Sequence, residues 1–149
     1  MKTREMKPIL ITIDVEECDI PLEYGFSIPL EEQLAISKEG LSHFMQIVEE
    51  AGVPVTIFCT GVYAENNPEW IKSLNPSHEL ASHGYFHGHF DASKDLKNSK
   101  DLLEKLSGKP VTGFRMARMQ YVEEAEILKA GYSYHSSLNP TWIPGRYDH

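Results

Sequence analysis

The segment Pro8-Ile9-Leu10-Ile11-Thr12-Ile13-Asp14-Val15-Glu16 joins an apolar, β-branched run to two carboxylates. The run over residues 9–13 is typical of a strand that is buried on both faces of a parallel sheet. Four similar runs follow at residues 55–58, 79–82, 111–114 and 132–136. Helical patterns lie between successive runs, and this alternation predicts βαβ units in a parallel sheet or barrel. The expected fold class is therefore α/β.

Apolar spacing and end signals identify the helices. Leu41, Phe44, Met45 and Val48 recur at i, i+3, i+4 and i+7, and Gly52 supplies a C-terminal stop. Residues 67–69, Asn-Pro-Glu, open a short helix with a cap, an N1 proline and an acidic first turn. Two further helices are expected between residues 91 and 108 and over residues 123–129, whereas the stretch 20–29, with its Pro and Gly, predicts a loop.

Length and composition limit the class of protein. A chain of 149 residues that is 41% hydrophobic and 24% charged suits one globular domain, which we expect to span residues 1–149. The net charge is −8 and no cluster of Lys and Arg stands out, which disfavours a nucleic-acid partner. No apolar run is long enough for a membrane span or a signal peptide, so the sequence as written predicts a cytoplasmic protein, with an export signal removed from the chain as the alternative.

Two cysteines, Cys18 and Cys59, are the only ones in the sequence. They do not form a Cys-x-x-Cys pair, which argues against a zinc site built from thiolates. We expect both to be reduced, core-type residues rather than a disulfide.

Candidate functional side chains follow the predicted strands. In parallel α/β proteins the functional groups gather at the carboxyl ends of strands, where Asp14 and Glu16 lie. Because side chains alternate along extended backbone, these two carboxylates would point the same way. His83 and His87 follow the third strand four residues apart, a spacing that lets both imidazoles face one point. Two carboxylates and two imidazoles are sufficient to hold one divalent cation and activate a water beside it.

A second group of candidates follows the fourth and fifth strands. Arg115 ends the fourth strand, where a guanidinium can orient a carboxylate through a bidentate pair. Arg118 lies three residues further on, and His135 lies in the fifth strand. His89 adds an imidazole near the pair and is expected to be a bystander, while His78 is expected at the surface.

Four motifs in this order resemble the polysaccharide deacetylases with a NodB-homology domain, carbohydrate esterase family 4. They are Thr12-Ile13-Asp14-Val15-Glu16, Glu79-Leu80-Ala81-Ser82-His83-Gly84-Tyr85-Phe86-His87, Gly113-Phe114-Arg115 and Gly131-Tyr132-Ser133-Tyr134-His135-Ser136-Ser137-Leu138. The resemblance covers nearly the whole chain. It implies a distorted (β/α) barrel with seven or eight strands, of which the five expected here form an incomplete, C-terminally truncated part.

The resemblance also implies an activity and roles for five residues. The activity is metal-dependent hydrolysis of N-acetyl or similar acyl groups on an amino sugar or glycan. By position, Asp14 matches the general base and Arg115 the arginine that orients it. Glu16, His83 and His87 match the metal ligands, and the metal implied is Zn²⁺, with Co²⁺ or Ni²⁺ as alternatives.

The sequence departs from the family pattern at several points. The metal carboxylate is usually Asp and is here Glu16, and Met116-Ala117-Arg118 stands where a proline is usual. His135 replaces an Asp, and the family's last motif, Leu-x-Ile-His, with its general-acid histidine, does not occur. Met116, Arg118 and His135 therefore mark the region expected to contact substrate or the oxyanion, with His135 a candidate acid.

Alternatives remain open from sequence. One is a metal-independent amidase or allantoinase-like hydrolase of the same fold, and another is a catalytically inactive sugar- or metal-binding module. An amidohydrolase using His87 and His89 fits poorly, because that pair follows the third strand rather than the first. The expected partner is an N-acetylated sugar or glycan, and a lipid- or diphosphate-linked form is considered because Arg118 could meet a phosphate. The oligomeric state is not predicted.

Overall fold

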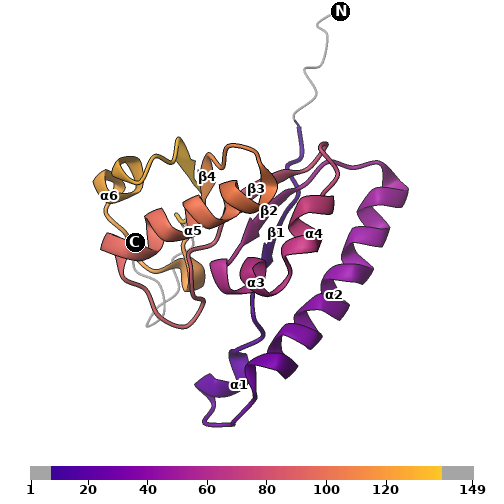
Figure 1. The fold of residues 1–149 in the computed structure, drawn as a ribbon, viewed down its shortest axis with the longest axis horizontal. Coiled ribbons are helices and arrows are strands. Elements are labelled where there is room, and N and C mark those ends of the chain that lie inside the picture. The colour runs from indigo at the N-terminus through magenta and orange to yellow at the C-terminus, as the bar shows by residue number, and fades with distance from the viewer. Residues whose placement is uncertain (1–7, 139–149) are drawn as a thin grey trace, which may run out of the picture.

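Five short parallel strands form the sheet of this computed structural model, in which residues 8–138 are described (Figure 1). The strands are β1 (Thr12–Val15), β2 (Thr56–Cys59), β3 (Glu79–Ser82), β4 (Gly113–Phe114) and β5 (Tyr134–His135). They lie side by side in chain order, and every neighbouring pair is parallel. Strand order without a reversal is the pattern of a (β/α) barrel rather than of a doubly wound sheet. Residues 8–138 therefore form an open part of such a barrel.

Helices connect the strands and cover the sheet. They are α1 (Ile20–Glu23), α2 (Leu30–Ala51), α3 (Gly61–Asn66), α4 (Pro68–Ser73), α5 (Ala92–Ser107) and α6 (Glu124–Lys129), with a 3-10 turn, η1, at Ala117–Met119. Figure 1 shows α3, α4 and α5 in front of the sheet and the long α2 along its β1 side. Within residues 8–138, no helix has both the length and the apolar character needed to cross a membrane.

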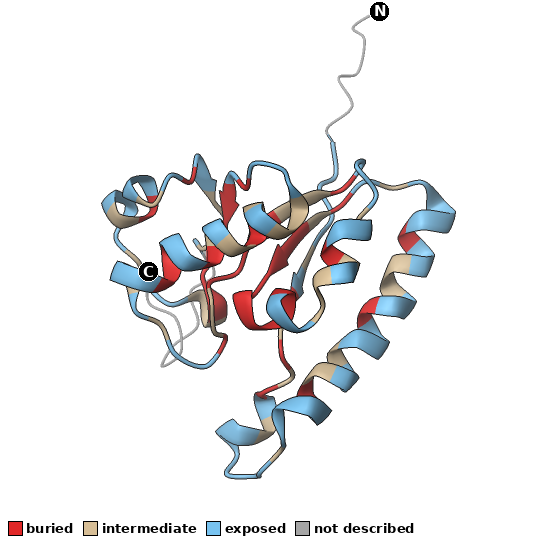
Figure 2. Ribbon diagram, in the orientation of Figure 1, coloured by how far each residue is buried: buried red, intermediate tan, exposed pale blue. Residues whose placement is uncertain are grey.

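The core lies between the sheet and the helices, where Figure 2 shows the buried residues in red on the central strands and on the inner sides of the helices. Ile57 and Cys59 of β2 belong to this core, together with Leu96 and Leu103 of α5. Phe58, between them, points to the opposite face because side chains alternate along a strand. There the Arg115 guanidinium lies over its ring, 4.0 Å from the centroid. Strand β2 thus contributes to the core on one face and contacts Arg115 on the other.

Strand register brings the ends of the strands to one level. Val15 pairs with Cys59, Cys59 with Ser82, and Ser82 with Phe114. The backbone ladder continues past the assigned strands: His83 N donates to Cys59 O at 2.9 Å and Arg115 N to Ser82 O at 2.8 Å. The residues that follow β1, β3 and β4 therefore meet at one edge of the sheet.

The first strand begins later than the sequence pattern predicts. Ile9 and Leu10 are 89% and 85% exposed, and none of residues 9–13 is buried, so the prediction of a strand buried on both faces over 9–13 is wrong. Only Thr12 and Ile13 of this run belong to β1. The register Thr12–Thr56 would place Leu10 opposite Pro54, which has no N–H to give to the ladder. Pairing therefore starts at Thr12.

Other boundaries also differ from the prediction. The expected loop over 20–29 contains the single-turn helix α1, which has Pro21 in its first turn, and α2 begins well before its apolar stripe. Helix α3 was not predicted; Thr60 caps it by accepting a hydrogen bond from Tyr63 N at 3.2 Å. The strands β4 and β5 are two residues each, shorter than the expected runs.

Two predictions about single side chains can also be checked. His78 is buried rather than at the surface: its Nδ1 accepts the N–H of Val55 at 3.2 Å and its Nε2 lies 3.0 Å from Glu49. Cys18 and Cys59 are both free thiols; Cys59 is buried in the core as expected, whereas Cys18 is only half-buried. Burial raises the pKa of the Cys59 thiol, with the nearby Glu17 charge adding to the effect.

Candidate active site

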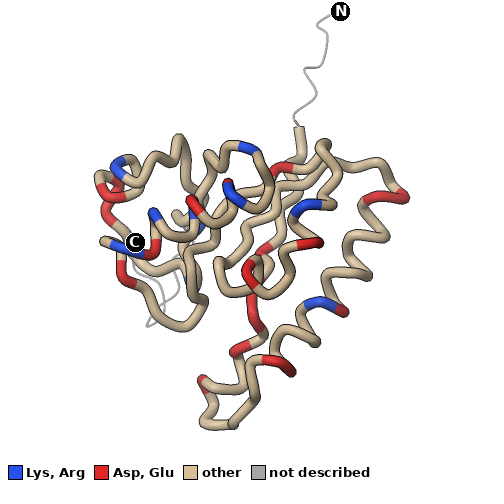
Figure 3. The backbone as a smooth tube through the Cα atoms, in the orientation of Figure 1, with Lys and Arg blue, Asp and Glu red and all other residues tan. Residues whose placement is uncertain are grey.

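Four acidic residues lie at the end of β1 and in the segment that follows it. Asp14 ends the strand with Val15, and Glu16, Glu17 and Asp19 come next along the segment that leads to α1, seen as the red band there in Figure 3. Glu17 and Asp19 are buried, and buried carboxylates are rare in proteins unless they have hydrogen-bond or ion-pair partners. Each of the four acids has different contacts, so each has its own structural task.

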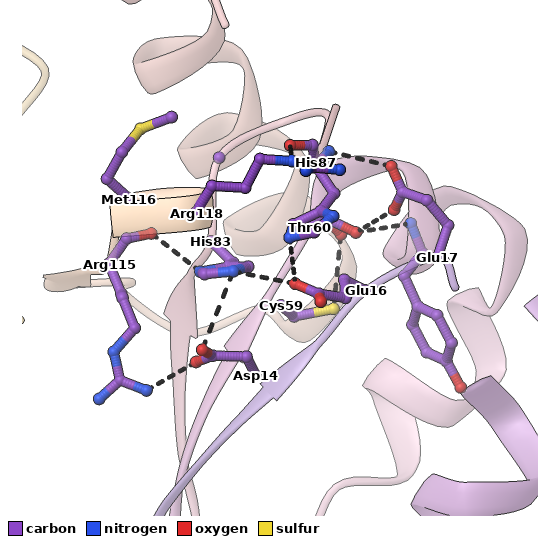
Figure 4. Close-up of polar contacts among 12 residues, drawn as sticks. Asp14, Glu16, Glu17, Cys59, Thr60, His83, His87, Arg115, Met116 and Arg118 are labelled. Atoms are coloured by element: carbon purple, nitrogen blue, oxygen red, sulfur yellow. Dashed lines mark hydrogen bonds and ion pairs between the residues drawn. The ribbon is translucent and has the colours of Figure 1, made fainter. Parts of the chain in front are cut away.

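Glu16, His83 and His87 converge on one point (Figure 4). Oε2 of Glu16 lies 3.0 Å from Nε2 of His83 and 3.2 Å from Nε2 of His87. One ligand atom from each of the three residues lies within 4.8 Å of the other two. The histidines reach this point from a turn after β3, in which Gly84 has a φ of +82°, rather than from a helix.

Hydrogen bonds fix which imidazole nitrogens face this point. Nδ1 of His83 lies 3.0 Å from the carbonyl of Arg115, and Nδ1 of His87 lies 2.7 Å from Oδ1 of Asp19. A carbonyl and a carboxylate only accept, so both Nδ1 atoms carry the proton. Both Nε2 atoms then present lone pairs toward Glu16.

When both imidazoles are neutral, three lone pairs therefore face one another at this point. Oε2 of Glu16 is buried and has no hydrogen-bond partner among the described residues. A buried acceptor in this state costs free energy unless a cation, a water or an N–H donor satisfies it. One carboxylate and two neutral imidazoles are donors that suit a divalent transition metal such as Zn²⁺, and the residues present fit such an ion.

Asp14 lies beside this triad and is held by Arg115. Nη1 of Arg115 donates to Oδ1 of Asp14 at 2.6 Å, whereas Oδ2 of Asp14 lies 4.0 Å from Nε2 of His83. The predicted bidentate pair is wrong, because Nη2 of Arg115 donates instead to Thr12 Oγ1 at 3.0 Å and to Ser136 Oγ at 2.9 Å. One oxygen of Asp14 is thus left without a guanidinium partner.

The triad and Asp14 line a pocket of about 340 Å³. The other lining residues are Glu23, Met116, Arg118 and Met119. Arg118 is not free to bind a phosphate: Nη2 donates to Asp19 Oδ2 at 2.8 Å and Nη1 pairs with Glu23. Nothing in these contacts favours a diphosphate-linked substrate.

Two other predicted residues lie differently with respect to this pocket. Met116 lines it, but its N–H donates to Ser137 Oγ at 2.9 Å and so is not available for an oxyanion. His135 lines a neighbouring cavity of about 240 Å³ instead, which it shares with Met119 and Tyr121. Its Nδ1 is buried without a hydrogen-bond partner among the described residues. The structure therefore does not bring His135 to the triad.

Sequence reasoning missed Glu17, Asp19 and Thr60. Thr60 Oγ1 donates to Glu17 Oε2 at 2.9 Å, and the other oxygen of Glu17 accepts the backbone N–H of His87 at 3.0 Å. The density of acids over residues 14–19 was the available signal. His89, the expected bystander, stacks on Phe86 and is not part of the triad.

Comparison with known proteins places the sequence in a family. The profile described as polysaccharide deacetylase matches residues 3–135. Among curated proteins, no sequence matches significantly.

Solved structures share the fold. A protein from Mycobacterium smegmatis assigned as a polysaccharide deacetylase is 24% identical, with a TM-score of 0.67 over 87% of this chain and 50% of that one. PuuE allantoinase is 19% identical, with a TM-score of 0.63 over 92% and 57%. A CE4 family pseudoenzyme from Bacillus anthracis is 16% identical, with a TM-score of 0.59 over 89% and 44%. The chain spans about half the length of these proteins.

The family match covers most of the chain, and the order of the strands and the motifs at their ends agree with it. The chain belongs to the polysaccharide deacetylase family, with the α/β fold of the CE4 deacetylases in the form of a partial barrel.

Proposed function

We propose that this chain is a metal-dependent hydrolase that removes N-acetyl, or similar acyl, groups from an amino sugar or glycan. The observation that carries the proposal is the convergence of three possible ligand atoms, from Glu16, His83 and His87, beside Asp14, which has one oxygen that Arg115 does not contact. Family membership supports the reaction class. The geometry supports the assignment of roles.

Glu16, His83 and His87 would hold the metal ion. A divalent ion such as Zn²⁺, Co²⁺ or Ni²⁺ supplies a Lewis acid that polarises an acyl carbonyl and lowers the pKa of a bound water. The two histidines are oriented for this task by their Nδ1–H bonds, which leave Nε2 as the ligand atom. Three protein ligands leave further positions for water and substrate.

Asp14 would be the general base. Its Oδ2 faces the pocket beside the triad and can accept a proton from the attacking water. When the amide C–N bond breaks, the same carboxyl can return that proton to the departing amine nitrogen. Asp14 alone can then serve as both base and acid. A separate acid such as His135, which does not line this pocket, is not needed.

Arg115 would hold Asp14 in place. Its guanidinium is fixed by Thr12 and Ser136 and by stacking on Phe58, so the contact to Oδ1 of Asp14 has little freedom. A base held by one oxygen presents the other in a constant direction, which favours proton transfer over rotation of the carboxylate.

A catalytically inactive binding module is the second candidate. One observation favours it: the fold is similar to that of a CE4 family pseudoenzyme. A hydrolase of the same fold that works without metal is a third, since an allantoinase also shares the fold. The metal-dependent form is preferred because, with both imidazoles neutral, the three facing acceptors would repel one another without a cation.

Acetate release tests the proposal. The protein loaded with Zn²⁺, Co²⁺ or Ni²⁺ should release acetate from N-acetylated amino-sugar oligomers, a chelator should abolish the release, and Glu16→Ala should be inactive. Release that is unaffected by chelator would favour the metal-free hydrolase. Zinc binding without any release from a panel of acylated sugars would favour the binding module. Because Asp19 and Glu23 already engage Arg118, diphosphate-linked sugars should show no advantage.

A further inference from the structure

Three charged side chains hold His87 at three different points. Its backbone N–H donates to Glu17 Oε1 at 3.0 Å, its ring Nδ1–H donates to Asp19 Oδ1 at 2.7 Å, and its carbonyl accepts from Arg118 Nε at 3.3 Å. Figure 4 shows Glu17 and Arg118 on opposite sides of His87. The position of this residue therefore depends on side chains from two distant parts of the sequence.

His83 is held in a different way. Its N–H donates to the carbonyl of Cys59 at 2.9 Å, and its ring Nδ1–H donates to the carbonyl of Arg115 at 3.0 Å. Both acceptors are main-chain atoms at the ends of strands, which a side-chain substitution does not remove. Substitutions of the side chains that hold His87 should therefore affect His87 and leave His83 in place, so that His83 serves as an internal reference.

Asp19 has no freedom to change its bonding. Oδ1 accepts from His87, Oδ2 accepts from Arg118 at 2.8 Å, and its side chain is 8% exposed. A Cβ on Gly88 would lie 3.2 Å from Oδ2, so the neighbouring turn closes on the carboxylate. Both oxygens are assigned, one to the imidazole and one to the guanidinium.

Arg118 adopts a backbone conformation that side chains disfavour. Its φ is +56°, in the left-handed region, and Met119 follows at +50°. Such residues persist where surrounding contacts hold them, and they cluster at functional sites. Here the contacts are those of the Arg118 side chain to Asp19 and Glu23 and to the carbonyl of His87.

We propose that Asp19 and Arg118 are positioning residues that set the tautomer of His87, with Glu17 anchoring its backbone. Asp19 keeps the proton on Nδ1, so that Nε2 is free to bind the ion, and Arg118 fixes Asp19 in the orientation that does so. The inference rests on the proposed function, because it gives these residues their role through a metal ligand. Partners of this kind typically affect metal affinity by about 10- to 100-fold.

The Arg118 contact makes the effect of Asp19→Asn specific. Arg118 only donates, so the amide oxygen of the new side chain would turn to it and the NH₂ would face His87. His87 Nδ1 would then have to accept, and its proton would move to Nε2, the atom that faces Glu16. Removing the guanidinium as well, in Asp19→Asn/Arg118→Met, frees the amide to rotate and offer its oxygen to His87 again.

Histidine ¹⁵N NMR of the metal-free protein and Zn²⁺ affinity by competition with a chromophoric chelator test this prediction. In the wild type, both His83 and His87 should carry the proton on Nδ1. Asp19→Asn should move the His87 proton to Nε2, leave His83 unchanged and weaken Zn²⁺ binding by about 10- to 100-fold. The double variant should restore the Nδ1 tautomer and part of the affinity. Asp101→Asn, which removes an exposed carboxylate paired with Lys97, is the matched control and should change nothing.

The outcomes separate this inference from the proposed function. If wild type and Glu16→Ala bind Zn²⁺ equally weakly, the metal site fails, whereas the tautomer of His87 still reports on Asp19. If Asp19→Asn keeps the wild-type tautomer and affinity, or if the double variant is no better than the single one, the positioning role is overturned. Should Asp19→Asn not fold, as judged by the His83 signals, Arg118→Met tests the same pair. It should retain the Nδ1 tautomer with weakened Zn²⁺ binding, and wild-type affinity would count against the role of Arg118.

Discussion

Arg115 holds one oxygen of Asp14, with Nη1 2.6 Å from Oδ1, and leaves the other oxygen 4.0 Å from Nε2 of His83. The two oxygens of one carboxylate are therefore unequal. A metal ligand beside Glu16 would need no such arginine, whereas a base gains from having one oxygen fixed and one free. This asymmetry separates the roles proposed for Asp14 and Glu16.

Asp14→Asn should lower kcat for acetate release by about 10²- to 10⁴-fold, because an amide of the same shape cannot take a proton. Zn²⁺ affinity should stay within a few-fold of wild type, since the ligand set of Glu16, His83 and His87 is unchanged. Loss of metal together with activity would instead make Asp14 a ligand, and full activity would remove it from the mechanism.

Arg115→Lys should reduce kcat by about 10- to 100-fold with little change in KM, because misplacing the base by about 1 Å has effects of this size. A lysine cannot contact Asp14, Thr12 and Ser136 at once, and it loses the stacking on Phe58. Thr12→Val, which removes one of these contacts, is the control and should have a smaller effect. Equal losses for the two variants would contradict the proposed role of Arg115.

Zinc should stabilise the protein against heat. An ion that binds only the folded state adds about 2.7 kcal/mol at a free concentration one hundred times its Kd. For a domain of this size, each kcal/mol raises Tm by a few degrees. Differential scanning fluorimetry with and without Zn²⁺ should show this rise in the wild type and not in Glu16→Ala; a similar rise in both would place the ion elsewhere.

Much of the fold and the outline of the site follow from the sequence, because both rest on local patterns. The apolar runs predicted five parallel strands, and the rule that functional groups follow strand ends brought Asp14, Glu16, His83 and Arg115 together. The start of β1 was misplaced because pairing depends on Pro54, which is distant in sequence.

The contacts that orient the site could not be predicted in the same way. Asp19 and Arg118 are 99 residues apart, and no local pattern pairs them. A phosphate partner is considered for Arg118 because the sequence shows the charge of this residue but not its partners, Asp19 and Glu23. Glu17 was passed over since a buried carboxylate has no signature in sequence, only in the hydrogen bonds it accepts from Thr60 and His87.

Tyr132 should give the protein an alkaline limit to its stability. Burial raises the pKa of this phenol to about 12, and its hydroxyl donates to the carbonyl of Leu96 at 2.8 Å. In the unfolded chain this phenol ionises near pH 10. The stabilising effect of the neutral Tyr132 hydroxyl is therefore complete below pH 10 and is lost as the pH rises toward 12. Urea unfolding of wild type and Tyr132→Phe should therefore differ most at neutral pH, and the difference should shrink between pH 10 and 12. A constant difference would show that Tyr132 does not cause the pH dependence.

Gly61 connects the fold to the site through a close approach to the turn that carries the histidines. A Cβ at this position would lie 2.7 and 2.8 Å from ring atoms of Tyr85, while Gly61 N donates to Gly84 O and Val62 N to Tyr85 O, each at 2.9 Å. Gly61→Ala should therefore push on the turn between His83 and His87, lower the free energy of unfolding by about 1–3 kcal/mol and weaken Zn²⁺ binding. Gly40→Ala is the matched control, because nothing lies within 4 Å of its Cβ and alanine favours the helix α2 by about 1 kcal/mol. Urea unfolding and chelator competition on both variants measure the two effects. If Gly61→Ala lost stability but bound Zn²⁺ as tightly as wild type, the position of the histidines would not depend on the packing between α3 and this turn.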